Sequence, residues 1–120
     1  MGHDKLRSML GICRKAGQLV LGADAVTDSI NNRQAQLVLL TQDLSRRSIE
    51  KMAAAANNKS VKVRKIPLLM EDIGGLTGKK SGIIAVTDKG LADAVEIRIR
   101  ALTDSPQESL RRPANEEGTI

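Results

Sequence analysis

The chain has 120 residues, a size that fits one domain with a single hydrophobic core. It contains no Phe, Tyr or Trp, which excludes nucleic-acid modules that stack bases on aromatic rings, such as the usual RNA-recognition sheet and most single-strand-binding barrels. Lys and Arg outnumber Asp and Glu by 19 to 14, and this net charge of +5 favours a polyanionic partner.

Helix and strand patterns alternate in the first part of the chain. Apolar residues at three- and four-residue steps predict a helix over residues 4–15, followed by a short strand over 18–21. Gly22 opens a second predicted helix that continues to residue 31. Its expected inward-facing residues are Ala23, Val26 and Ile30. Residues 36–41 are nearly all apolar, which is typical of a strand buried on both faces in a parallel sheet.

The same alternation continues to about residue 103. Ser45 is predicted to cap a helix that runs to about residue 57, where Asn57 and Asn58 would permit a left-handed end. Its expected buried residues are Ile49, Met52, Ala53 and Ala56. An alternating pattern predicts an exposed edge strand over 61–66, and Pro67 fits the first turn of a short helix through about residue 73. A flexible glycine-rich loop follows, then a buried strand over 83–87 and a last helix from Asp88 to about residue 103.

This order of elements predicts the α/β class and a three-layer α/β/α sandwich with a small, largely parallel mixed sheet. Residues 1–103 would form the domain and residues 104–120 a disordered tail, because the tail has few apolar residues. Residues 1–103 hold seventeen basic and ten acidic side chains, a net charge of +7. The predicted folded part is therefore more basic than the whole chain.

Neither catalysis nor a cofactor is predicted from the reactive side chains. Cys13, the sole cysteine, lies on the apolar stripe of the first helix, so we expect a buried thiol, no internal disulfide and a reducing, cytoplasmic location. The sole histidine, His3, lies in the loose start of the chain and is not expected to activate that thiol. Residues 78–81 differ from a phosphate-binding loop because Lys80 stands where Ser or Thr should follow the lysine. We therefore expect no enzyme, no metal site and no cofactor.

No membrane segment is predicted either. The longest uninterrupted apolar run has five residues, 52–56, whereas a helix that spans a bilayer needs about 20. No secretory signal is expected, because the first residues are polar and lead into no long apolar region.

Four ordered strings carry a family resemblance: Leu-Gly-Ile at 10–12, Lys-Ala-Gly-Gln-Leu-Val-Leu-Gly at 15–22, Ala-Gln-Leu-Val-Leu-Leu at 35–40 with Asp43 after it, and Ile-Ala-Val-Thr-Asp-Lys-Gly at 84–90. Over about residues 5–100 the chain resembles the ribosomal protein L-seven-Ae family, and within it a bacterial YlxQ-like branch. The resemblance implies a single α/β/α domain that binds structured RNA, typically a kink-turn, without catalysis.

The resemblance also implies which positions contact RNA. They lie at the start of the second helix, in the loop after the buried strand and in the loop before the last strand. Carried onto this chain, the binding residues are Gly22, Ala23, Asp24, Asp43, Arg46, Lys79, Lys80, Gly82 and Ile83. A helix N-terminus suits phosphates and base-edge acceptors because its first N–H groups are unpaired, and the two lysines add positive charge.

The second helix departs from the family pattern at several positions. Known kink-turn binders carry Lys-Gly, then Asn-Glu, then a further Lys, whereas this chain has Leu21-Gly22, Asp24-Ala25 and Asp28. The added carboxylates would cost on the order of 1 kcal/mol beside phosphate. We expect a non-catalytic, ribosome-associated protein that binds structured RNA, including ribosomal RNA. The alternative, motivated by these three departures, is a protein-interaction module that kept the fold and lost the RNA site.

Overall fold

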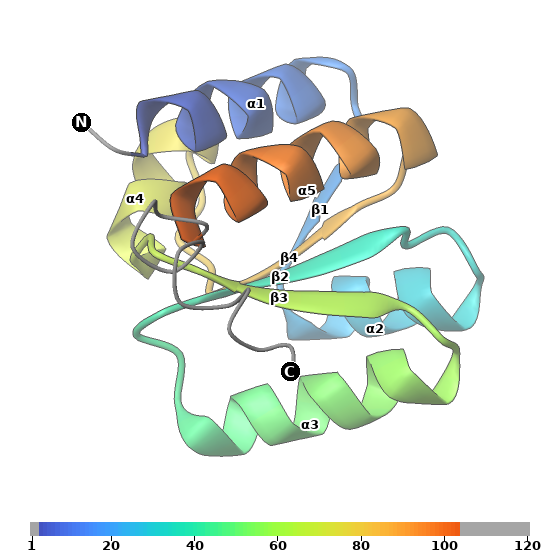
Figure 1. Ribbon diagram of the computed structural model, residues 1–120. Helices are drawn as coiled ribbons and strands as arrows, with labels where there is room; N and C mark the ends of the chain where they lie inside the picture. Colours follow the sequence, from blue (N-terminus) through green and yellow to red (C-terminus); the bar gives the residue numbers. More distant parts are fainter. Residues whose placement is uncertain (1–2, 104–120) are drawn as a thin grey trace, which may run out of the picture.

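Helices and strands alternate along the chain in the computed structural model, which describes residues 3–103 (Figure 1). The helices are α1 (Asp4–Lys15), α2 (Ala23–Asn31), α3 (Arg46–Asn58), α4 (Met70–Thr77) and α5 (Lys89–Thr103). The strands are β1 (Leu19–Leu21), β2 (Leu37–Thr41), β3 (Lys62–Ile66) and β4 (Ile83–Val86). The predicted order of elements is therefore confirmed. The predicted tail, residues 104–120, lies outside the described residues.

The described strands form one mixed sheet in the order β1-β4-β2-β3. β4 runs antiparallel to both of its neighbours, β1 and β2, and only β2 and β3 are parallel. The prediction of a largely parallel sheet was therefore wrong. A strand covered by helices on both faces is apolar throughout whichever way it runs, so the apolar runs gave burial but not direction.

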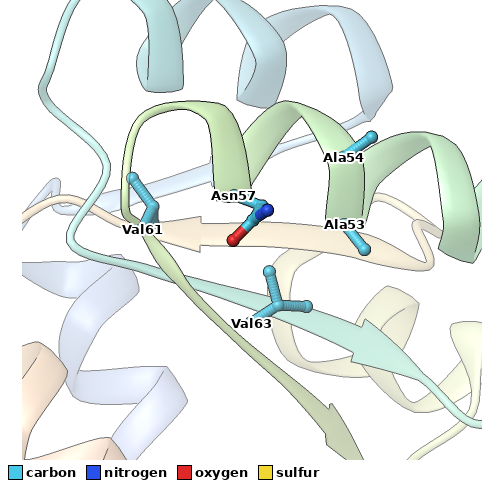
Figure 2. A pocket seen from close by; sticks show the side chains of 5 residues that line it. All are labelled: Ala53, Ala54, Asn57, Val61 and Val63. Carbon is cyan, nitrogen blue, oxygen red and sulfur yellow. The ribbon is translucent and has the colours of Figure 1, made fainter.

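The helices cover the sheet on both sides, which confirms the α/β class and the three-layer sandwich. In Figure 1, α1, α4 and α5 lie on one face, and α2 and α3 lie on the other. β3 is the outer strand beside β2, as its alternating pattern predicted. Its Val63, with Val61 just before it, packs on the α2 and α3 side, where Figure 2 shows them below α3.

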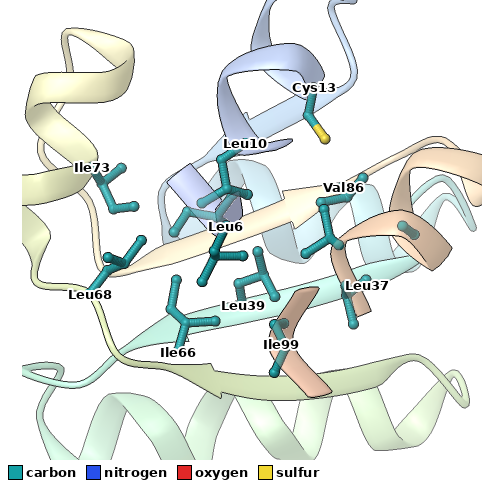
Figure 3. Close-up of a cluster of buried hydrophobic side chains, with 13 residues drawn as sticks. Leu6, Leu10, Cys13, Leu37, Leu39, Ile66, Leu68, Ile73, Val86 and Ile99 are labelled. Carbon is teal, nitrogen blue, oxygen red and sulfur yellow. The ribbon is translucent and has the colours of Figure 1, made fainter. Parts of the chain in front are cut away.

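Two hydrophobic clusters separate the three layers. On the α1, α4 and α5 side, Leu6 and Leu10 of α1 meet Leu37 and Leu39 of β2 (Figure 3). On the other side, Val38 and Leu40 of β2 meet these side chains from the two covering helices: Val26, Ile30, Met52 and Ala56. All five residues of β2 are buried. The successive side chains of this central strand thus fill both clusters, as the unbroken apolar run predicted.

Two helix boundaries differ from the predicted ones. α4 begins at Met70 rather than near Pro67, and it includes Gly74 and Gly75, which were predicted in a loop. The reason is that carboxylates satisfy the first N–H groups at this later start: Asp72 accepts from Leu69, and Asp43 accepts from Met70. At the end of α3, Asn57 and Asn58 stay helical. Ser60, with φ of 59°, takes the left-handed conformation instead.

The buried face of α2 is shifted from the predicted one, and the buried face of α3 is narrower than predicted. Ala23, at the start of α2, is exposed. Ser29, near the end of the helix, is buried and was not predicted to be. In α3 only Met52 and Ala56 are buried, while Ile49 and Ala53 are half-buried. The first turn of α2 therefore projects beyond the core and leaves Ala23 in solvent.

Candidate nucleic-acid interface

Three loops meet at one end of the sheet because of the strand directions. Leu21, the last residue of β1, lies opposite Ile84, and Leu40 of β2 lies opposite Ile83 at the start of β4. Since β4 lies between β1 and β2, the loop before β4 lies between the start of α2 and the loop that leads from β2 to α3. The fold thus brings together the three segments that the sequence predicted to contact RNA.

Gly22 is the single residue between β1 and α2. Its φ of 100° and ψ of 150° belong to a region that only glycine populates readily. Its N–H donates to the Ile83 carbonyl at 3.0 Å, and its own carbonyl accepts from Val26 at 2.9 Å. As the N-cap residue it offers no side-chain hydrogen bond. The N–H groups of the first turn, including those of Ala23 and Asp24, therefore have no side-chain cap. They lie at an exposed helix N-terminus, where the helix dipole gives a positive potential.

Only one of the two predicted loop lysines reaches this helix start. Lys79 places its Nζ atom 3.7 Å from the position that a Cβ atom on Gly22 would occupy. The loop is held there by Thr77, whose hydroxyl donates to the Ile73 carbonyl at 2.8 Å and accepts from the Lys79 N–H at 3.2 Å. Lys80 turns the other way, and its Cγ atom lies 3.0 Å from the Cβ position of Gly74. Its aliphatic stem therefore covers α4.

Gly82 and Ile83 join the loops beneath the surface rather than present side chains to solvent. A Cβ atom on Gly82 would lie 2.7 Å from Leu44 Cδ1 and 2.9 Å from Thr41 Oγ1, so the close approach of the two loops requires glycine here. The Gly82 carbonyl accepts from the Thr41 N–H at 3.0 Å. Ile83 is 6% exposed. Both residues were predicted to bind RNA. In the structure they lie beneath the surface and support the exposed residues of the neighbouring loops.

The loop after β2 contributes one engaged carboxylate and one exposed cation. Asp43 accepts from the Met70 N–H at 3.1 and 3.3 Å, so it ties this loop to the start of α4. The side chain of Arg46 is 91% exposed and pairs with Glu50 at 3.3 Å, a weak surface contact. Ser45 caps α3 as predicted, because its hydroxyl accepts from the Ser48 N–H at 3.2 Å.

Several polar residues in these loops were not found from the sequence. Ser81 is buried, and its hydroxyl donates to the Ile83 carbonyl at 2.9 Å and accepts from the Ile83 N–H at 3.2 Å. Thr41 is fully buried at the end of β2, and its hydroxyl has no hydrogen-bond partner within residues 3–103. The signal for Ser81 and Thr77 was their place beside glycines just before a buried strand, where short polar side chains often hold turns.

The single cysteine of the chain lies in the hydrophobic core. Cys13 is fully buried in the α1 cluster, and burial raises the pKa of its thiol. Among the described residues, no group of three or more His, Cys, Asp or Glu side chains is placed to hold a metal ion. None of the helices within residues 3–103 is long and apolar enough to cross a membrane.

These features define a small α/β/α protein with a mixed sheet and an exposed, glycine-led helix start at the sheet end. Residues 4–96 match the model of the Ribosomal protein L7Ae/L30e/S12e/Gadd45 family, and the chain belongs to that family. The resemblance found in the sequence is therefore confirmed.

Individual relatives agree with this assignment. The chain is 35% identical over 86 residues to the RNA-binding protein YlxQ of Bacillus subtilis (strain 168), covering 71% of this chain and 85% of that protein. A protein of unknown function from Bacillus halodurans C superposes with a TM-score of 0.73 at 26% identity, covering 84% of this chain and 98% of that one. The Giardia lamblia 15.5kD RNA binding protein has a TM-score of 0.67 at 15% identity, covering 82% and 87%, and so shares the fold.

Proposed function

We propose that this protein binds structured RNA at the start of α2, recognises a kink-turn and performs no turnover. The observation that carries the proposal is the exposed first turn of α2, which follows Gly22 directly and has the ammonium group of Lys79 beside it. The printed name of the Bacillus subtilis relative, an RNA-binding protein, supports the same function. A ribosome-associated role with ribosomal RNA as partner is part of the proposal.

The α2 start offers three kinds of contact to a bent RNA. Its amide N–H groups and helix dipole attract phosphate oxygens, and Gly22 has no side chain to keep the backbone away. Lys79 adds a cation next to the same spot. Asp24 is exposed and has no hydrogen-bond or ion-pair partner among the described residues, so its carboxylate can accept from guanine N–H donors. Arg46 adds a further cation at the start of α3.

This arrangement favours a kink over a regular duplex. In A-form RNA the major-groove edges of the bases lie in a deep, narrow groove that side chains do not reach. A kink opens the strands and exposes guanine edges, where a short helix start can enter. Since the chain has no Phe, Tyr or Trp, it cannot stack bases on those rings, and shape with charge supplies the specificity. Asp28, also exposed on α2, opposes phosphate and limits how far the helix can lie along the backbone.

The residues that motivated an interaction module do not mark a separate surface. Leu21 is partly buried and packs against the cluster beneath α1 and α5. Its departure from the family pattern is therefore explained by core packing. Ala25 and Asp28 remain exposed on the first turns of α2, in the surface that the RNA proposal uses.

The test compares a kink-turn RNA with a regular duplex of equal length and base composition. We expect the kink-turn to bind at least about tenfold tighter, a difference of about 1.4 kcal/mol, in fluorescence anisotropy at fixed salt. Each phosphate contact should lower log K by about one unit per log unit of salt. Equal affinity for the two RNAs would contradict the kink-turn part of the proposal.

Lysine variants test the site itself. Lys79→Ala should weaken binding and reduce the salt slope by about one. Lys80→Ala should have a smaller effect, because the stem of Lys80 lies on α4. Lys15→Ala is the matched control. Lys15 is the last residue of α1 and precedes the start of β1, whereas the α2 start follows the end of that strand. If Lys79→Ala and Lys15→Ala have the same salt slope as the unmodified protein, Lys79 is not a phosphate contact.

A further inference from the structure

A groove runs between α3 and the outer edge of the sheet. Its lining residues are Ala53, Ala54, Asn57, Val61 and Val63, and it encloses about 410 Å³ (Figure 2). The alanines are the reason that it is open: α3 presents small side chains here, so the helix does not cover the edge of β3. The groove is lined by different residues from the α2 start and lies beside a different strand.

The outer edge of β3 is open to a further strand. β3 pairs with β2 on one side and has no other strand partner among the described residues. The Val63 carbonyl accepts a hydrogen bond of 3.3 Å from the guanidinium of Arg64. A side chain can reach this carbonyl on the open side of the strand, so the carbonyl points away from β2. Within a strand the N–H and carbonyl of one residue point the same way. Val63 therefore offers both a donor and an acceptor to an incoming strand.

The charge around the groove selects the occupant. Residues 46–66, which form α3, β3 and the turn between them, hold seven Lys or Arg and one Glu. Glu96 of α5 binds Arg64 at 2.9 Å and Lys62 at 3.6 Å on the opposite face of β3 from Val63. An added strand whose apolar side chains enter the groove turns its alternate side chains to this opposite face, where the side chain of Lys62 remains 61% exposed. Edge lysines of this kind repel a second copy of the same strand and attract an acidic one.

We propose that β3 and α3 form a docking site for an extended acidic peptide of a partner protein. The peptide adds to β3 as a further strand, its alternate apolar side chains enter the groove, and its carboxylates point to the opposite face of the sheet, toward Lys62. RNA would also be drawn by the charge, but it has neither the strand backbone that pairs with Val63 nor apolar side chains for Ala53 and Ala54. The proposal is independent of RNA binding at the start of α2.

The test uses a synthetic hexapeptide that alternates glutamate and valine, added to isotope-labelled protein. We expect amide shifts along β3 and slower hydrogen exchange of the Val63 amide, because that N–H becomes paired. Ala54→Glu fills and charges the groove from an exposed helical position, and it should weaken peptide binding at least about tenfold. Ala101→Glu is the matched control, since it makes the same change at an exposed position of α5, on the other face of the sheet.

Four outcomes would overturn the proposal. The first is an absence of shifts along β3, and the second is equal weakening by the α3 and α5 variants, which would indicate charge attraction without a site. The third is equal binding of a peptide with lysine in place of glutamate. The fourth is that a short single-stranded RNA shifts the β3 amides while the acidic peptide does not. In contrast, loss of binding when proline replaces the central valine of the peptide would support strand addition, because proline removes a backbone donor.

Discussion

Replacing Gly22 by alanine is expected to destabilise the protein through the backbone alone. At φ of 100° and ψ of 150°, a residue with a Cβ atom is strained by about 1–3 kcal/mol. The new Cβ atom would lie 3.7 Å from Lys79 Nζ, an ordinary contact, so no steric clash adds to this cost. For a domain of about 100 residues, each kcal/mol lowers the melting temperature by roughly 4–8 °C.

The assay is urea or thermal unfolding followed by far-ultraviolet circular dichroism, because the chain has no aromatic residue for fluorescence. Gly11→Ala is the matched control: Gly11 lies inside α1, and nothing is within 4 Å of its Cβ position. This control should stabilise the protein by about 0.5–1 kcal/mol, since alanine favours a helix interior. If Gly22→Ala were as stable as the unmodified protein, the reasoning about its conformation would be refuted.

Three further changes test the packing around the site, each by urea unfolding. Gly82→Ala should cost about 1–3 kcal/mol because its Cβ atom would press on Leu44; an unchanged stability would mean that the loops can separate freely. Thr41→Val should stabilise by about 1 kcal/mol, because it removes a buried hydroxyl that has no partner in the described part of the chain, and a loss of stability would contradict this. Asp72→Asn should destabilise the folded protein at neutral pH, because hydrogen bonds from the Leu69 N–H and the guanidinium of Arg7 lower the pKa of Asp72. A carboxylate whose pKa is lower in the folded than in the unfolded state stabilises the fold at pH above its unfolded pKa, and this stabilisation is lost as the pH falls through the folded pKa. The difference in stability between the two proteins should therefore shrink below pH ~4, and a difference independent of pH would contradict this role of Asp72.

Burial could be predicted from the sequence, but strand direction could not. The apolar run at 36–41 gave the central strand, and three- and four-residue steps gave α1 and α5. The place of β4 between β1 and β2 depends on tertiary pairing, which no local pattern encodes. The start of α4 was also missed, because one of its capping carboxylates, Asp43, lies 27 residues away.

The candidate site was predicted in part for a similar reason. The family resemblance located Gly22 and the two neighbouring loops, and the fold brings them together. The different orientations of Lys79 and Lys80 could not be predicted, since adjacent residues look equivalent until the loop is anchored by Thr77. The supporting role of Gly82 likewise follows from Leu44 and appears only in the folded chain.

Amide shift mapping with a kink-turn RNA is the decisive experiment for RNA binding at the start of α2, because it locates the contact surface residue by residue. We expect the largest shifts at residues 22–25 and 79–81, with little change along the β3 groove. Shifts confined to other surfaces, or none at an RNA concentration that saturates binding, would contradict the claim that the start of α2 binds RNA.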